Sequence, residues 1–384
     1  MNVRAYYAAQ GMVPLGQKLG EIKWSLAILI ALIACAGFAV LYSAAGGSLS
    51  PWAERQMFRF MIGFFILVGV ACVDLRVWMG LAYPAYGFSL LLLVAVEIAG
   101  RVGLGAQRWI ELGPLQLQPS ELMKIALVLA LSRYLHGLAP GEVSRPFRLI
   151  VPLIMIAVPA VLVLMQPNLG TATLLAVGGA LLLFLAGLSW YWIASTVAAI
   201  AVAVPSAWEF LLHDYQKQRV LTFLHPDSDA LGAGWNITQA KIALGSGGLF
   251  GKGFLMGTQS RLNFLPEKET DFVLPIIGEE FGFFGTMLLF LLFAAVIWYG
   301  IQIAMTARSQ FGRLLAMGVT VNFFLYIMIN ALMVMGLIPV VGIPMPLISY
   351  GGTAMMTVMF GFGLLMSVHV HRHITVPRHS SGMI

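Results

Sequence analysis

Ionisable side chains within or beside long apolar stretches are the residues of this sequence best placed to do chemistry, because a charge at membrane depth is costly without a function or a partner. Asp271 lies in the run Phe264–Phe272, where a polar segment meets an apolar stretch. A carboxylate there could take a proton from a hydroxyl group as a general base. It could also cap the following helix, since Asp accepts hydrogen bonds from first-turn amides. Both roles remain open at this point.

Two pairs of charged residues lie deeper in apolar stretches. Glu279 and Glu280 are adjacent on the helix predicted after Asp271, so they point to different sides and only one can face a given cavity. Glu121 and Lys124 are three residues apart on another predicted helix, a spacing that suits an internal ion pair. Structural pairing is the favoured interpretation, with a binding role as the alternative.

An Arg-Trp pair lies in a short polar segment between two apolar stretches. Trp109 follows Arg108 there. A Trp at this place is either an interfacial belt residue or a platform for the face of a sugar.

Membrane-spanning helices must position these residues. The chain has 384 residues, of which 60% are hydrophobic and 10% charged, and its mean hydropathy is +0.89, which excludes a soluble domain. About 20 apolar residues cross a hydrocarbon core of about 30 Å. The sequence predicts an all-α polytopic protein of about ten transmembrane helices in one domain, residues 1–384: 24–44, 57–73, 77–98, 119–136, 148–165, 169–188, 190–212, 272–300, 314–338 and 347–368. The helix at 119–136 is the weakest of them, since its charges require shielding by neighbouring helices.

Basic residues indicate the orientation of these helices. Lys and Arg concentrate at both termini and in alternate connections, which predicts that both termini are cytoplasmic. The net charge of +6 follows from this bias, so we expect no nucleic-acid partner. Cys35 and Cys72 fall inside predicted helices and are not expected to form a disulfide.

The polar segment 213–271, between the seventh and eighth helices, is the long outer loop of this arrangement. Its glycines favour tight turns and close approach of the backbone to a ligand. Apolar residues between the glycines favour an ordered loop over a solvated linker. The run Gly245–Gly253 does not match a nucleotide-binding loop, because Ser246 and Gly253 replace a required Gly and hydroxyl. His369, His371 and His373 have a metal-like spacing, but a basic membrane-surface tail is the simpler interpretation.

Several motifs together resemble the SEDS family of membrane peptidoglycan glycosyltransferases. They occur in the family's order: Gly105–Trp109, Gln118–Lys124, Gln166–Thr171, Gly245–Gly253, Phe264–Phe272 and Pro344–Thr353. The stretch Met256–Phe264 resembles the elongation branch more than the division branch, which has the same chemistry. Two positions depart from the family pattern: Asn168 stands where Asp is common, and Lys268-Glu269 where a His often precedes the Thr-Asp pair.

The resemblance implies an inverting glycosyltransferase that polymerises lipid II at the outer face of the inner membrane, beside a class B penicillin-binding protein as transpeptidase partner. Asp271 matches the family's catalytic carboxylate and Trp109 the Trp of its Arg-Trp motif. The leaving diphosphate needs cations, which are either basic side chains or a divalent ion, Mg²⁺ or Mn²⁺. The predicted substrate-binding residues are Trp109, Arg108, Glu121, Lys124, Lys252, Arg261, Glu279 and Ser349.

Two other functions remain as alternatives. A lipid II transporter would use the charged residues at membrane depth to line a path, although the candidate polar groups concentrate near one face. A scaffold that only recruits the transpeptidase would not require a carboxylate at the start of a helix.

Overall fold

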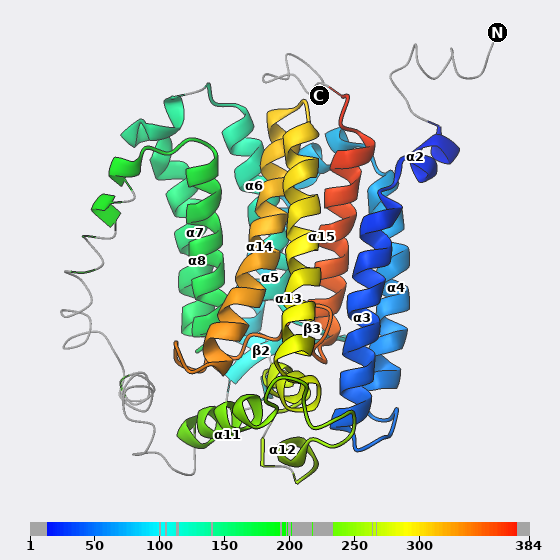
Figure 1. Ribbon diagram of the computed structural model, residues 1–384. Coiled ribbons are helices and arrows are strands. Elements are labelled where there is room, and N and C mark those ends of the chain that lie inside the picture. Colours follow the sequence, from blue (N-terminus) through cyan, green and yellow to red (C-terminus); the bar gives the residue numbers. More distant parts are fainter. Residues whose placement is uncertain are drawn as a thin grey trace.

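The computed structural model describes residues 14–99, 101–103, 106–112, 115–139, 141–192, 194–196, 198, 201, 217, 233–262, 264, 265 and 267–374. Figure 1 shows a bundle of long helices that run side by side. Helix α2 and the end of α15 lie at one end, which we call the terminal end. A small sheet, α11 and α12 lie at the other, which we call the sheet end.

The long helices agree with the predicted spans. The helices of the bundle are α2 (Leu15–Glu21), α3 (Trp24–Ala44), α4 (Ala53–Cys72), α5 (Leu75–Ala99), α6 (Pro119–His136), α7 (Pro146–Met165), α8 (Leu169–Leu185), α13 (Val273–Thr306), α14 (Gln310–Val334) and α15 (Gly352–Val370). Among the described residues seven of these, α3, α4, α5, α7, α13, α14 and α15, are long and apolar enough to cross a membrane. Helix α8 is shorter, and most of the span predicted at 190–212 lies outside the described residues. The all-helical polytopic fold is therefore confirmed.

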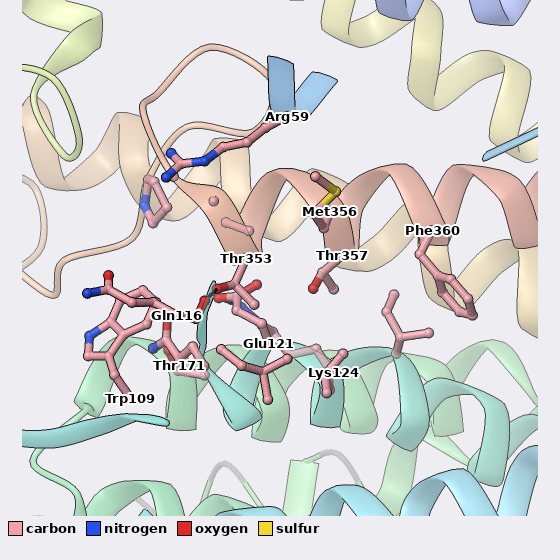
Figure 2. A pocket seen from close by; sticks show the side chains of 18 of the residues that line it. Arg59, Trp109, Gln116, Glu121, Lys124, Thr171, Thr353, Met356, Thr357 and Phe360 are labelled. Carbon is pink, nitrogen blue, oxygen red and sulfur yellow. Dashed lines mark hydrogen bonds and ion pairs between the residues drawn. The ribbon is translucent and has the colours of Figure 1, made fainter. Parts of the chain in front are cut away.

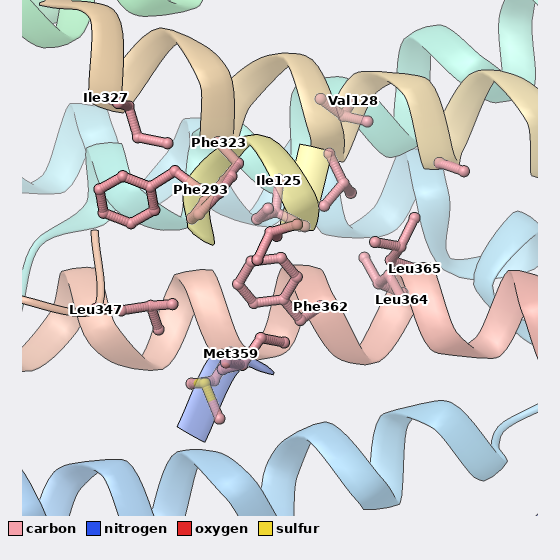
Figure 3. Close-up of a cluster of buried hydrophobic side chains, with 14 of the residues drawn as sticks. Ile125, Val128, Phe293, Phe323, Ile327, Leu347, Met359, Phe362, Leu364 and Leu365 are labelled. Carbon is pink, nitrogen blue, oxygen red and sulfur yellow. The ribbon is translucent and has the colours of Figure 1, made fainter. Parts of the chain in front are cut away.

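Helices α6, α14 and α15 form the centre of the bundle. Nearly every residue of α6 is buried, including Glu121 and Lys124, so the neighbours do shield its charges. Phe323 of α14 packs edge-on against Phe293 of α13 and Phe362 of α15, with ring centroids 5.7 and 5.1 Å apart (Figure 3). Outward-facing side chains such as Leu91 and Trp298 are apolar, as lipid contact requires.

A small antiparallel sheet joins α5 to α6 at the sheet end, although the sequence predicted an all-α protein with no strands. Its strands are β1 (Arg101–Gly103), β2 (Ala106–Leu112) and β3 (Leu115–Leu117), in the order β1-β2-β3. Ile110 of β2 lies opposite Leu117 of β3. Strands this short gave no recognisable alternation in the sequence, and each pairs with its neighbour along the chain.

A Gly-rich loop packs against α13 at a point where that helix is broken. This loop follows α11 (Ala233–Ser246) and precedes α12 (Thr258–Arg261). Gly282 is non-helical, with φ 66° and ψ −160°. Around it, Lys252 N donates to Glu279 O (2.9 Å) and Phe283 N donates to Gly248 O (2.9 Å). The loop therefore supplies backbone hydrogen-bond partners that the broken helix lacks.

Glycine is required in the loop because two backbones touch. A Cβ at Gly247 would lie 1.9 Å from Gly278 O, and one at Gly251 would lie 2.1 Å from Glu280 O. The predicted order of the loop is confirmed for residues 233–262. The sequence predicted that the glycines let the loop approach a ligand. At Gly247 and Gly251 the loop instead approaches the backbone of α13.

Candidate functional site

A cavity of about 1830 Å³ opens among the helices near the sheet end. Its polar lining comes from the sheet, the turn between α7 and α8, the turn before α13, the segment before α15 and the sheet-end parts of α4 and α6. Its apolar lining comes from α4, α5, α6 and α15. The apolar wall includes Phe58, Ile62, Ile66, Leu81, Phe88, Leu129 and Phe360. Its lining residues on α4 run from Glu54 to Ile66, which is about 18 Å along that helix.

Asp271 lines the polar part of the cavity, in a turn that begins at Glu267. Its amide donates to Glu267 O (3.2 Å), and its carbonyl accepts from the side chain of Asn330 (2.9 Å). Burial, together with the charges of Glu267 and Glu269, raises the pKa of Asp271 to about 7, although Arg108 opposes the shift. Phe272 is the N-cap of α13 and receives no side-chain cap, so the capping role considered for Asp271 is not observed.

Strand β2 carries Arg108 and Trp109 into the cavity wall (Trp109, Figure 2). The Arg108 guanidinium donates to Gln166 O (3.1 Å) and to Pro167 O, in the turn between α7 and α8. In that turn Asn168 Oδ1 accepts from Thr171 N (3.2 Å), so the side chain of Asn168 caps the start of α8. The turn therefore fixes an Arg side chain close enough to Asp271 to influence its charge.

Glu121 and Lys124 form a buried ion pair in the cavity wall, which confirms their predicted pairing. Lys124 Nζ lies 2.6 Å from Glu121 Oε1. Tyr326 of α14 completes the group, because its hydroxyl donates to Glu121 Oε2 (2.6 Å) and also contacts Lys124 Nζ. Sequence spacing could not reveal this third member, which lies 202 residues from Lys124.

Two arginines of α4 also line the cavity, although the sequence analysis did not assign them to the site. Arg55 and Arg59 are one turn apart. The Arg59 guanidinium lies over the ring of Tyr350, 4.7 Å from its centroid, and its Nη1 is buried without a hydrogen-bond partner among the described residues. Figure 2 shows Arg59 and Trp109 on different walls of the cavity. A buried guanidinium N–H of this kind is a strong donor for an anion.

The other predicted site residues lie elsewhere. Lys252 Nζ pairs with Glu279 Oε1 (2.6 Å), and Glu279 also accepts from Thr258. This contact joins the Gly-rich loop to α13. Arg261 is exposed at the end of α12. Ser349 Oγ accepts from Met345 N (2.9 Å), inside the segment before α15. These four residues are not in the cavity wall, and their predicted contacts with substrate stay predictions.

Several polar residues have structural partners outside the cavity. Glu280 accepts a hydrogen bond from Ser43 of α3. His371 Nδ1 lies 2.9 Å from Ser367 O at the terminal end. Within the described part of the chain no group of three or more His, Cys, Asp or Glu side chains could hold a metal ion.

The chain is similar to known proteins over nearly its whole length. A family model described as cell cycle protein, covering FtsW, RodA and SpoVE, matches residues 22–374. The peptidoglycan glycosyltransferase MrdB of Escherichia coli (strain K12) is 44% identical over 348 residues, which cover 90% of this chain and 93% of the relative. The probable peptidoglycan glycosyltransferase FtsW of Trichlorobacter lovleyi is 33% identical over 361 residues, covering 91% and 94%.

Solved structures share the fold. One, described as structural coordination of polymerization and crosslinking by a peptidoglycan synthase complex, has a TM-score of 0.81 at 32% identity, covering 92% of this chain and 98% of that one. The crystal structure of the rod shape determining protein RodA of Thermus thermophilus has a TM-score of 0.70 at 29% identity, with the same coverage. Because the family model matches residues 22–374 and MrdB is 44% identical over 90% of the chain, the chain belongs to the SEDS family of FtsW, RodA and SpoVE.

Proposed function

We propose that this protein polymerises lipid II into glycan strands during cell elongation, at the outer face of the bacterial cytoplasmic membrane, with Asp271 as the general base. Its class, a peptidoglycan glycosyltransferase of the RodA type, follows from its family and from the 44% identity to MrdB. The observation that carries the proposal is a carboxylate with a pKa of about 7 in a cavity that is polar at one end and apolar along the rest.

The cavity matches an amphiphilic substrate. Its volume of about 1830 Å³ exceeds the range of about 300–1,000 Å³ that is common for small-molecule sites. A polyprenyl tail would lie against the apolar wall, from Phe58 towards Phe360, and the sugar diphosphate would lie near Arg55, Arg59 and Arg108. Trp109 then offers a flat face to a sugar.

The reaction needs one displacement. Asp271 takes the proton of the acceptor sugar hydroxyl while the hydroxyl oxygen attacks the anomeric carbon of the donor. The bond from that carbon to the diphosphate oxygen breaks, and its electron pair leaves on the diphosphate. The arginines of the cavity stabilise this charge. Among the described residues Arg59 Nη1 has no hydrogen-bond partner, so its N–H groups can donate to the diphosphate. Because a single displacement inverts the carbon, no covalent glycosyl-enzyme is required.

A divalent cation, Mg²⁺ or Mn²⁺, is a further part of the proposal. The described residues contain no cluster of three protein ligands for it. Mg²⁺ often keeps its waters and binds through one or two carboxylates and substrate phosphates, so waters and diphosphate oxygens would supply most of its ligands. The displacement described above does not depend on the ion.

The orientation and the partner are also proposals. Short segments at the terminal end are rich in basic residues, among them Arg76, Arg145, Arg148, Arg308 and Arg313, which supports a cytoplasmic terminal end and an outer sheet end. The similarity to a chain of a peptidoglycan synthase complex supports a transpeptidase partner of the class B penicillin-binding type.

Lipid II transport is a second candidate, because the cavity also reaches Trp78, which is near the start of α5 at the terminal end. One experiment separates the two functions. The purified protein and its partner are given labelled lipid II, and glycan polymer is compared for the wild type, Asp271→Asn and a control, Asp74→Asn, at the terminal end. Polymer from the wild type and the control, but not from Asp271→Asn, supports the proposal. Full polymerisation by Asp271→Asn removes Asp271 as the base. Lipid II movement in vesicles without polymerisation by the wild type favours transport.

A further inference from the structure

Asn330 lies directly behind the turn that carries Asp271. It is on α14, one turn before that helix ends, and its side chain is 0% exposed. Asparagine has two N–H donors on its side-chain nitrogen. Asn330 Nδ2 donates to Asp271 O (2.9 Å) and to Ile343 O (2.7 Å), so both donors serve irregular segments that border the cavity.

The segment at Ile343 forms the wall against the Asp271 carboxylate. Gly342 has φ 67°, and a Cβ built on it would lie 3.3 Å from Asp271 Oδ2. The position of residue 342 therefore limits where the carboxylate can lie. The amide of Asn330 binds both the carbonyl of Asp271 and the carbonyl of Ile343, the residue after Gly342. This one side chain therefore sets the distance between the Asp271 turn and the segment at Gly342.

A second contact restrains the same turn. Tyr350 N donates to Glu269 O (2.7 Å), which ties the turn to the segment before α15. The turn itself contains Glu267 with φ 49°, an uncommon conformation for a residue other than glycine. A turn with such a residue depends on its surroundings for its shape, and Asn330 supplies the contact nearest to the base.

We propose that Asn330 is a positioning residue, whose amide holds the Asp271 peptide and the Ile343 peptide together and so keeps the carboxylate in reach of the acceptor hydroxyl. This inference rests on the proposed function, in which Asp271 is the base. Asn330 is not in the cavity wall and does not need to touch the substrate.

The expected effect falls on turnover and not on substrate affinity. Displacement of a reacting group by about 1 Å can lower a rate by about a hundredfold. Asn330→Ala should therefore lower kcat by about 10- to 100-fold per folded molecule, with KM within about threefold of the wild type. Asn330→Asp keeps the side-chain volume but loses the paired donors, and should show the same division between kcat and KM.

The matched control is Ser367→Ala. Ser367 is buried on α15, and its hydroxyl donates to a main-chain carbonyl, Val73 O (2.8 Å), at the terminal end and away from Asp271. Polymerisation of labelled lipid II is measured for each full-length variant with the transpeptidase, after gel filtration and thermal melting establish the folded fraction. Ser367→Ala should keep the wild-type kcat.

Asp271→Asn is measured in parallel to separate the two proposals. If Asp271→Asn retains wild-type turnover, the base is wrong and the positioning role fails with it. If Asp271→Asn is inactive while the Asn330 variants turn over like the wild type, only the positioning role fails. Equal losses of kcat in Asn330→Ala and Ser367→Ala would also overturn it, and Asn330→Asp decides the matter should Asn330→Ala not fold.

Discussion

The environment of Asp271 gives the carboxylate an affinity for protons that suits a base near neutral pH. Burial is the largest cause of the raised pKa, followed by the negative charges of Glu267 and Glu269, and Arg108 acts in the opposite direction. A more acidic carboxylate would be ionised but a weaker base. A pKa near the working pH balances the ionised fraction against basicity.

Turnover should therefore depend on the ionisation of Asp271. We expect kcat/KM to be low below pH 6, to rise as Asp271 loses its proton near pH 7, and to level above it, because only the ionised carboxylate accepts a proton. Glu267→Gln removes a neighbouring negative charge and should move this rise to lower pH. The measurement is the rate of glycan polymerisation against pH.

Glu142→Gln, at the terminal end, is the control for Glu267→Gln and should leave the pH profile unchanged. A profile with no rise near pH 7 would contradict the assignment of the base.

The stability of the fold should change with pH in the opposite direction to the rate. The pKa of Asp271 is higher in the folded than in the unfolded protein, so the folded state binds the proton more tightly. The resulting contribution to the free energy of unfolding is fully present below about pH 4 and is lost as the pH rises through about 7.

Sequence reasoning reached some residues of the site and not others, for a physical reason. Asp271 and the Glu121–Lys124 pair could be found, because a charge next to apolar residues is visible within one segment. Arg59, Tyr326 and Asn330 were missed, because their partners are on other helices. Lys252 and Glu279 pair with each other, although they are 27 residues apart in the sequence.

Among the elements, apolar stretches long enough to cross a membrane were predictable, whereas irregular structure was not. The small sheet and the break in α13 depend on backbone hydrogen bonds between segments. Hydropathy does not report such bonds. The glycine-rich composition predicted close backbone approach, but it did not identify α13 as the segment that is approached.

The contact between the Gly-rich loop and α13 should not tolerate a methyl group. We expect Gly251→Ala to destabilise the fold by more than about 2 kcal/mol, because the added Cβ would meet the backbone of Glu280 and Gly251 has φ 81°. The measurement is thermal unfolding of the purified protein in detergent.

Gly245→Ala is the matched control within the same glycine run. No atom lies within 4 Å of a Cβ at Gly245, which is in α11 and has no positive φ. Its melting temperature should equal or exceed that of the wild type, because alanine favours a helix. If Gly251→Ala and Gly245→Ala have the same melting temperature, the contact between the loop and α13 does not stabilise the fold.

For the whole molecule, the distribution of basic residues predicts which end faces the cytoplasm. In a background without Cys35 and Cys72, Met256→Cys at the sheet end should react with a membrane-impermeant thiol reagent in intact cells. His373→Cys at the terminal end should react only after permeabilisation. Both positions are exposed, so the membrane and not burial decides the outcome. The reverse labelling pattern would invert the proposed orientation.

The break in α13 also separates the turn that carries Asp271 from the part of the helix that crosses the bilayer. An unbroken helix of 34 residues would be about 51 Å long, well above a hydrocarbon core of about 30 Å, and would have to tilt as a single rod. Gly282 divides it into a short first part, held by the Gly-rich loop, and a longer part that crosses the membrane. We therefore expect membranes of different thickness to change the tilt of the long part at the break and to leave the angle between the cavity and the part that follows Asp271 unchanged.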